Sequence, residues 1–124
     1  MKIKALYFIG ILLIVYACNQ NDDIKTIIEG NYVGIFERNA NTSNVELNFH
    51  SGTYSGKSQI EKFPAICDGT YSISENIITF KSECIWTAEF DWSLILAEKW
   101  TYTHTNDTLI MINSNGDQYR IIKQ

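Results

Sequence analysis

Hydrophobic and polar residues alternate in short runs along most of the chain. From Ile24 onward, β-branched and aromatic residues form runs that end at turn residues. No segment there repeats apolar residues at i, i+3 and i+4 over three turns, so the pattern predicts strands rather than helices. Some of the ten runs are expected to merge or to be irregular, which leaves about eight strands. The runs are Asn31–Arg38, Val45–His50, Thr53–Ser58, Gly69–Ser74, Ile77–Ser82, Trp86–Phe90, Trp92–Leu96, Trp100–Thr105, Thr108–Asn113 and Gln118–Ile122.

Turn residues predict how neighbouring strands pair. A turn at Glu75-Asn76 places Tyr71 opposite Phe80 and Ile73 opposite Ile78. One face of this hairpin is then apolar and the other polar, which is typical of a half-buried antiparallel sheet. The strand lengths and spacings predict an all-β domain, built as a small antiparallel up-and-down barrel or as a sandwich.

Two further dipeptides predict hairpin turns in the C-terminal part. Asn115-Gly116 is the stronger signal, because both residues tolerate the positive φ that a two-residue type I′ turn requires. Asn106-Asp107 is the next strongest. We expect each of them to join two consecutive strands.

The first residues have the pattern of a signal peptide. Lys2 and Lys4 precede thirteen uncharged residues, 5–17. As a helix these cover about 20 Å, less than the ~30 Å hydrocarbon core of a membrane. The run ends at Val15-Tyr16-Ala17-Cys18, which resembles the lipobox of bacterial lipoproteins. That resemblance implies cleavage before Cys18 and acylation of its thiol and of the new amino terminus; the alternative is an uncleaved anchor helix with an incidental cysteine.

This interpretation divides the chain into three parts. Residues 1–17 are the expected lipoprotein signal peptide, residues 18–29 the acylated cysteine with a polar tether, and residues 30–124 the β domain. Asn19 stands where an inner-membrane retention signal would have Asp, and Asp22-Asp23 resembles the acidic signal that exports some lipoproteins to the cell surface. We therefore expect an outer-membrane lipid anchor, with the domain on the periplasmic or the surface face.

The remaining two cysteines are expected to form a disulfide. The register of the Glu75-Asn76 hairpin places Cys67 opposite Cys84 at a non-hydrogen-bonded pair, where Cα atoms approach to about 4.5 Å. Export would place both thiols in an oxidising compartment, and the bridge would be worth about 3 kcal/mol. The alternatives are two reduced thiols or a metal pair, but no histidine or third cysteine stands at ligand spacing.

The first predicted strand has a further resemblance. Gly30-Asn31-Tyr32-Val33-Gly34 resembles the Gly-x-Trp entry of lipocalins, with Tyr32 in place of Trp. The resemblance implies that Gly30 provides backbone room and that Tyr32 plugs the closed end of the barrel. Residues 67–112 are similar to small exported lipoproteins described as lipocalin-like. The alternative is an ordinary first strand with one inward aromatic residue.

Aromatic residues provide the candidate ligand site. Trp86, Phe90, Trp92, Trp100 and Tyr102 fall within seventeen residues, where they would either line a cavity or fill the barrel core. The first functional hypothesis is a lipocalin-like module that binds a small apolar or carbohydrate ligand through Tyr32, Trp86, Trp92 and Trp100. An interior cavity lined by these rings would favour it.

The alternative hypothesis is a protein-interaction or inhibitor module. Ser51–Lys57 is similar to the Ser/Gly-rich loop of small lipoprotein inhibitors of lysozyme, although a glycine-rich turn explains it equally well. A filled interior with exposed apolar loop tips would favour this hypothesis.

Composition excludes other functions. The formal net charge is −4, or −6 without Lys2 and Lys4, which argues against nucleic-acid binding. No catalytic motif, metal or cofactor site is expected, and His50 and His104 have no companion at ligand or triad spacing. The acidic residues are expected to be solvated rather than a catalytic pair: Glu83, Glu89, Asp91 and Glu98. We expect a monomer that is not an enzyme and that contacts the membrane through its acyl anchor.

Overall fold

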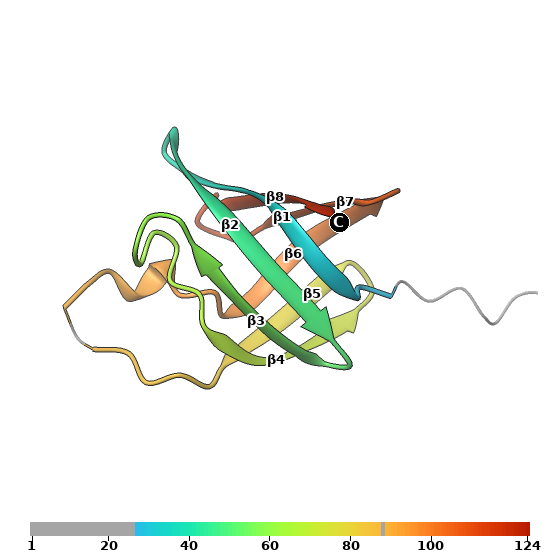
Figure 1. The fold of residues 1–124 in the computed structure, drawn as a ribbon, viewed down its shortest axis with the longest axis horizontal. Coiled ribbons are helices and arrows are strands. Elements are labelled where there is room, and N and C mark those ends of the chain that lie inside the picture. The colour runs from blue at the N-terminus through green and yellow to red at the C-terminus, as the bar shows by residue number, and fades with distance from the viewer. Residues whose placement is uncertain (1–26, 88) are drawn as a thin grey trace, which may run out of the picture.

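The computed structural model describes residues 27–87 and 89–124, and these form a closed antiparallel barrel (Figure 1). Each strand pairs with the next along the chain, and the last pairs with the first, so the up-and-down barrel is confirmed. The predicted signal peptide, Cys18 and the tether up to residue 26 lie outside the described residues. The elements are β1 (Gly30–Arg38), β2 (Asn41–His50), β3 (Thr53–Ser58), β4 (Asp68–Ser74), β5 (Ile77–Ser82), the short 3-10 helix η1 (Trp92–Leu94), β6 (Glu98–Thr105), β7 (Thr108–Ile112) and β8 (Gln118–Lys123).

Alternate side chains of every strand point inward and form one hydrophobic core. Aromatic rings dominate it: the centroids of Phe36 and Tyr119 are 5.0 Å apart, and Tyr54 meets Phe80 edge to face at 5.1 Å. An eight-stranded barrel has an interior just wide enough for side chains of this size to fill. The aromatic content of the chain is therefore used largely for packing.

One end of the barrel is closed where the chain enters β1. Ile28 is buried in the core, and its carbonyl oxygen accepts a hydrogen bond of 2.6 Å from the Tyr71 hydroxyl. The Glu29 carboxylate accepts a second bond, of 2.8 Å, from the backbone N–H of Ser51. Burial, followed by the nearby Glu29 carboxylate, raises the pKa of Tyr71 to about 12, so its hydroxyl remains a donor at neutral pH.

Two long connections close the opposite end, on the left of Figure 1. Ala65 and Leu96 are buried there, and their backbones are joined by two hydrogen bonds, Ala65 N to Leu94 O (2.9 Å) and Leu96 N to Ala65 O (3.0 Å). The Tyr54 hydroxyl donates to Leu96 O from inside the barrel at 3.1 Å. The core and both end closures are thus formed by residues 27–87 and 89–124.

Two predicted strands are not formed. Trp86–Phe90 belongs to an irregular connection between β5 and β6, and Trp92–Leu96 contains η1 instead. The Asp91 carboxylate accepts hydrogen bonds from the backbone N–H and the hydroxyl of Ser93, at 3.0 and 2.6 Å, and so caps η1. β2 also begins at Asn41 rather than at Val45.

All three predicted hairpins are formed, and two of them have the two-residue turn that was expected. Tyr71 pairs with Phe80 across Glu75-Asn76, and β6 and β7 pair across Asn106-Asp107. At Asn115-Gly116 the hairpin is formed between β7 and β8, but its turn is wider than the two-residue turn expected, because Ile112 pairs with Gln118 and leaves five residues between them, 113–117. The Asn113 side chain organises this wider turn by accepting hydrogen bonds of 3.0 Å from two backbone N–H groups, those of Asn115 and Asp117.

The predicted disulfide is confirmed between Cys67 and Cys84. Their Cα atoms are 6.3 Å apart, wider than the expected distance. β4 begins at Asp68 and β5 ends at Ser82, and the last backbone hydrogen bond of this pair joins Glu83 N to Asp68 O. The bridge therefore joins two segments that diverge beyond the ends of their strands.

Candidate functional site

The four predicted ligand-binding side chains lie in two different places. Tyr32 and Trp100 are buried inside the barrel. Trp86 and Trp92 belong to the connection between β5 and β6, and Trp92 is 54% exposed. These four rings therefore do not line one common site.

Tyr32 is buried inside the barrel on β1. Its ring packs edge to face on Phe49, and its hydroxyl lies 3.3 Å from Nε2 of His104. Burial, then the charge of Asp107, raises its pKa. Gly30 has a φ of +108°, and a Cβ there would lie 2.8 Å from Cε of Lys123, so this position needs glycine.

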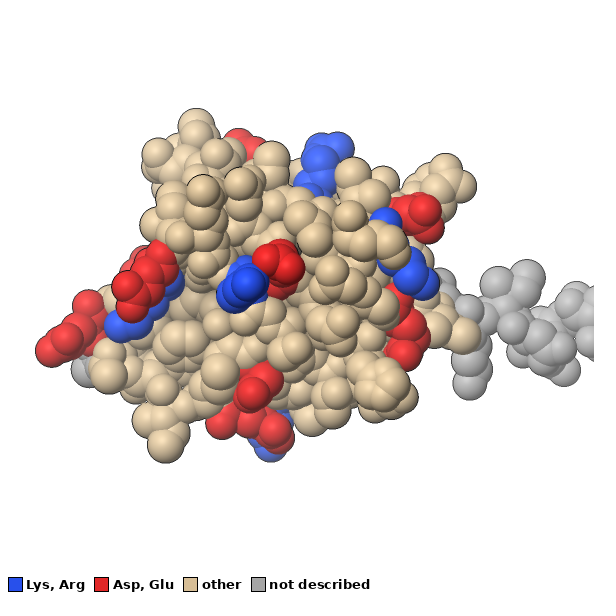
Figure 2. All heavy atoms as spheres, in the orientation of Figure 1, with Lys and Arg blue, Asp and Glu red and all other residues tan. Residues whose placement is uncertain are grey.

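A hollowed surface lies on the outside of the barrel, along β3. Three adjoining hollows of about 560, 300 and 280 Å³ all include Lys57 in their lining. We call them together the β3 groove. The groove runs over the outer faces of β1, β2 and β3 and continues onto the connections at the loop end, where Trp86 lines it. Figure 2 shows this side of the barrel with most charged side chains at its margins.

Half of the polar side chains that line the β3 groove are uncharged and make no hydrogen bond within the described residues. Within the described residues, five amide or hydroxyl side chains of its lining make no hydrogen bond: Asn31, Asn44, Asn48, Ser55 and Gln59. Each of these groups both donates and accepts hydrogen bonds. They are therefore available to a ligand with the same capacity.

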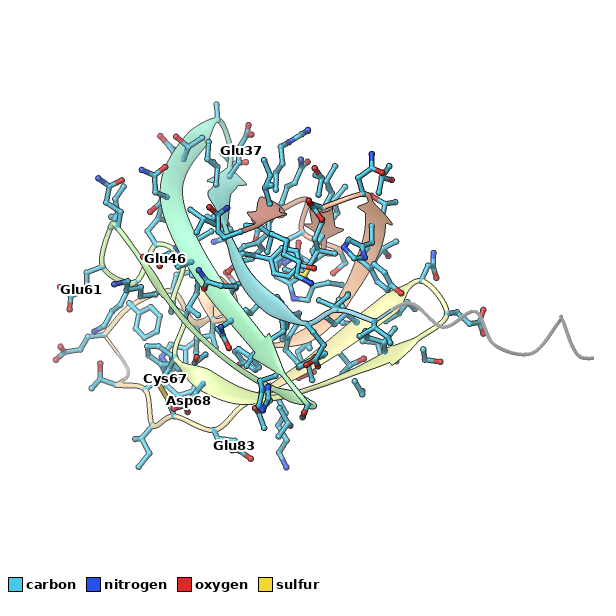
Figure 3. All side chains as sticks on the ribbon, turned by 45° about the vertical axis from the view of Figure 1, so that its right-hand side comes forward. Glu37, Glu46, Glu61, Cys67, Asp68 and Glu83 are labelled. Carbon is cyan, nitrogen blue, oxygen red and sulfur yellow. A yellow bond between two sulfur atoms is a disulfide. The ribbon has the colours of Figure 1, made fainter. Side chains whose placement is uncertain are left out.

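The charged side chains of the β3 groove balance one another. Lys57 Nζ lies 3.5 Å from the Glu46 carboxylate, and Glu61 and Lys62 line the loop end. Figure 3 shows Glu46 on the barrel wall and Glu61 on the connection beyond it. Two positive and two negative groups leave this lining without net charge.

Aromatic contacts hold the loop end of the groove together. The rings of Trp86 and Phe90 lie 5.7 Å apart, and Lys62 Nζ lies 5.0 Å from the centroid of Phe90. Trp86 Nε1 donates to the Ser82 hydroxyl at 3.2 Å, which fixes the indole beside the groove. The apolar side chains of Val33 and Ile35 border the groove from β1.

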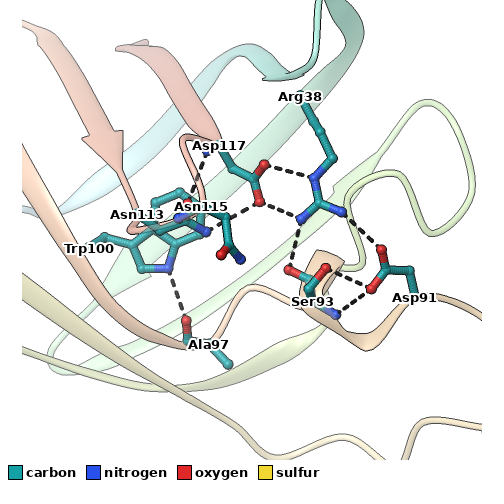
Figure 4. Close-up of polar contacts among 8 residues, drawn as sticks. All are labelled: Arg38, Asp91, Ser93, Ala97, Trp100, Asn113, Asn115 and Asp117. Carbon is teal, nitrogen blue, oxygen red and sulfur yellow. Dashed lines mark hydrogen bonds and ion pairs between the residues drawn. The ribbon is translucent and has the colours of Figure 1, made fainter.

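Arg38 ties the connection that carries η1 to the barrel (Figure 4). Its guanidinium donates from Nε to the buried Asp117 carboxylate at 2.7 Å, from Nη1 to Asp91 at 3.1 Å and from Nη2 to Ser93 O at 3.3 Å. The hydrogen bond to Asp117 is the main cause that raises the pKa of Arg38. Hydrogen bonds from Ser93, then the Arg38 charge, lower the pKa of Asp91. Arg38 and Asp91 therefore remain charged at neutral pH.

Ser51–Lys57 is not a projecting loop. Ser51 and Gly52 form a tight turn with positive φ at both residues, and β3 begins directly after them. Lys57 lies near the far end of that strand, paired with Glu46. The glycine-rich turn explains this segment.

No catalytic arrangement is visible among residues 27–87 and 89–124. His50 is exposed and lies 3.9 Å from Glu29, whereas His104 contacts the buried Tyr32. The ligand atoms of Cys67, Asp68 and Cys84 lie within 4.8 Å of one another, but the disulfide occupies both sulfur atoms. Thiolates are the form in which cysteine binds metals, so this cluster is a bridge in the oxidised chain.

Comparisons with known proteins identify no relative. No protein-family model, curated protein or solved structure matches the chain. Among the described residues, no helix has the length and apolar character needed to span a membrane. The functional inference therefore depends on the geometry of the barrel surface.

Sequence reasoning did not identify the β3 groove. Its lining combines β1, β2 and β3 with residues of the connection after β5. The signal that was present is the run of amide and hydroxyl residues at alternate positions of β2 and β3, such as Asn44, Asn48 and Ser55. Alternation predicts that they share an outer face, but only the strand pairing shows which side chains lie next to one another.

Proposed function

We propose that this protein is a lipid-anchored protein of the bacterial cell envelope that binds a neutral carbohydrate in the β3 groove. The observation that carries the proposal is the groove's lining of unpartnered amide and hydroxyl side chains with balanced charges. The filled core and the closed ends favour a site on the outer surface over one inside the barrel.

The groove chemistry distinguishes carbohydrate from an apolar ligand. A fatty acid or sterol would cover Asn44, Asn48 and Gln59 without satisfying their hydrogen bonds, which costs about 1–3 kcal/mol for each group left unpaired. Sugar hydroxyl groups donate and accept, as these amides do. Trp86, Val33 and Ile35 provide apolar surface for the C–H faces of the sugar rings.

Titration of residues 19–124 with neutral oligosaccharides tests this function. We expect backbone amide shifts of β2 and β3 in ¹⁵N–¹H spectra with at least one of chitotetraose, cellotetraose, maltotetraose or mannotetraose. Gln59→Ala and Trp86→Ala should each weaken binding about tenfold, because each removes roughly 1.4 kcal/mol of contact. Thr103→Ala, on the outer face of β6, is the matched control and should leave binding unchanged. Spectra without shifts for all four sugars at about 10 mM would overturn the proposal.

The anchor is tested separately by mass spectrometry of the protein expressed from its full sequence in a bacterium. We expect a mature chain that begins at Cys18 and carries fatty acyl groups, because two or three chains are needed for durable attachment. Cys18→Ser should abolish acylation, whereas Ser51→Ala should not. Detection of the intact initiator methionine on the mature protein would contradict the anchor.

A second candidate function, protein interaction, is favoured by two exposed side chains at the loop end. Ile85 is 97% exposed and Trp92 is 54% exposed. Exposed apolar side chains of this kind on one connection are typical of partner-binding surfaces. If this is the principal function, Trp92→Ser and Ile85→Ser will abolish partner binding without changing the oligosaccharide titration.

A further inference from the structure

The outer side of β7, β8 and β1 is the most apolar part of the barrel wall. Where these strands pair, their outward side chains form three cross-strand rows, and we call the nine residues the β7–β8–β1 face. Five of the nine are β-branched aliphatic residues. The rows are Val33–Ile122–Thr108, Ile35–Arg120–Ile110 and Glu37–Gln118–Ile112.

Many of the exposed hydrophobic side chains of the barrel belong to this one face. Val33, Ile35, Ile112 and Ile122 are between 36% and 49% exposed, and they make up half of the large exposed hydrophobic residues in the described chain. The outward positions of β2 and β3 are instead polar. Exposed aliphatic side chains gathered on one wall of a small domain in this way mark an interaction surface.

Two opposite charges lie side by side within the apolar face. Arg120 and Glu37 belong to adjacent rows and adjacent strands, and both are exposed. Neither forms an ion pair within the residues that the structure describes. Figure 3 shows Glu37 near the β1–β2 hairpin, apart from Glu61 and Cys67 at the loop end.

This charge pattern is self-complementary. In a two-fold symmetric contact, residue i of one copy meets residue j of the other and the reverse. A second copy can therefore place its Glu37 against Arg120 and its Arg120 against Glu37, with aliphatic side chains packed around both pairs. Addition of a strand is not available as an alternative mode, because every strand of the closed barrel is already paired on both sides.

We propose that the β7–β8–β1 face binds a second copy of this chain in a two-fold symmetric dimer, with Arg120 of each copy paired to Glu37 of the other. The face covers parts of three strands, which is small for a protein interface, so the dimer is expected to be weak. Val33 and Ile35 also border the β3 groove, so the dimer would cover the part of the groove rim that these two side chains form. The dimer is measured without sugar, and its failure is therefore distinguishable from failure of the proposed function.

Sedimentation velocity of residues 19–124 tests the dimer from about 5 to about 500 µM. We expect the weight-average mass to rise toward twice the monomer mass over this range. Arg120→Glu and Glu37→Arg should each weaken association at least tenfold, since each places like charges opposite one another. The double variant Arg120→Glu/Glu37→Arg should restore association, because it exchanges the two charges. Lys81→Glu, an exposed position of β5 outside the β7–β8–β1 face, is the control and should associate as the unaltered chain does.

Three results would contradict the proposed dimer. A chain that remains monomeric at the highest concentration overturns it, as does a dimer that both single variants leave unchanged. A double variant that stays monomeric, with a melting temperature close to that of the unaltered chain, rules out the Arg120–Glu37 pairing. Melting curves of all variants show that loss of association is not loss of fold.

Discussion

Replacement of Arg38 by methionine is expected to lower the free energy of unfolding by about 3 kcal/mol or more. The Asp117 side chain is only 3% exposed, and Arg38 is its charged partner at 2.7 Å. Methionine keeps much of the side-chain volume but leaves a buried carboxylate without a counter-charge. Domains of this size are stable by about 5–15 kcal/mol, so the loss is a large part of the total. Urea unfolding at neutral pH, followed by tryptophan fluorescence, measures it.

Two further variants separate this effect from general loss of a cation. Lys99→Met removes an exposed positive charge from β6 and should change stability by less than about 0.5 kcal/mol. Arg38→Met combined with Asp117→Asn should recover at least about 1 kcal/mol, because the amide does not carry the buried charge. A cost below about 1 kcal/mol for Arg38→Met would show that water reaches Asp117 and that the pair does not hold the end of the barrel.

Replacement of Cys67 by serine should lower stability by about 3 kcal/mol, or the melting temperature by roughly 10 °C. The disulfide joins two residues that are 17 positions apart, and it stabilises the fold mainly by restricting the unfolded chain. It also fixes the point where β4 and β5 diverge, next to the connection that carries Trp86. Calorimetry in non-reducing buffer provides the measurement.

The matched comparisons for the disulfide use the second cysteine and a reductant. Cys84→Ser and the double serine variant should melt at the same temperature as Cys67→Ser. Dithiothreitol should lower the melting temperature of the unaltered chain to that value and leave the variants unchanged. Equal melting of the oxidised unaltered chain and Cys67→Ser would mean that the bridge contributes no stability.

The sequence predicted the strand register correctly where two local signals agreed. At Glu75-Asn76, the turn dipeptide and the apolar alternation of Tyr71, Ile73, Ile78 and Phe80 required one register, and that register also aligned the cysteines. At Asn115-Gly116 the dipeptide predicted the hairpin but not the length of its turn. The side chain of Asn113 bonds to the backbone of the turn and stabilises a wider loop, and this competing interaction is not visible in a two-residue signal.

The remaining features depend on contacts between distant residues. Trp86 and Phe90 stand at strand-like spacing, but eight other strands already close the barrel, so this segment packs against Lys62 outside the wall. Arg38 and Asp117 are 79 positions apart, and no local pattern relates them. The β3 groove and the β7–β8–β1 face likewise depend on which side chains become neighbours across strands. Those neighbours are known only when the pairing of all eight strands is known.

The two ends of the folded chain lie together. The backbone N–H of Gln124 donates to Asn31 O at 2.8 Å, beside the start of β1. Anything that holds the molecule from either end therefore holds it from the same side, away from Trp86. Under the proposed lipid anchor, this placement of both ends would direct the loop end away from the membrane, whichever end of the domain is attached.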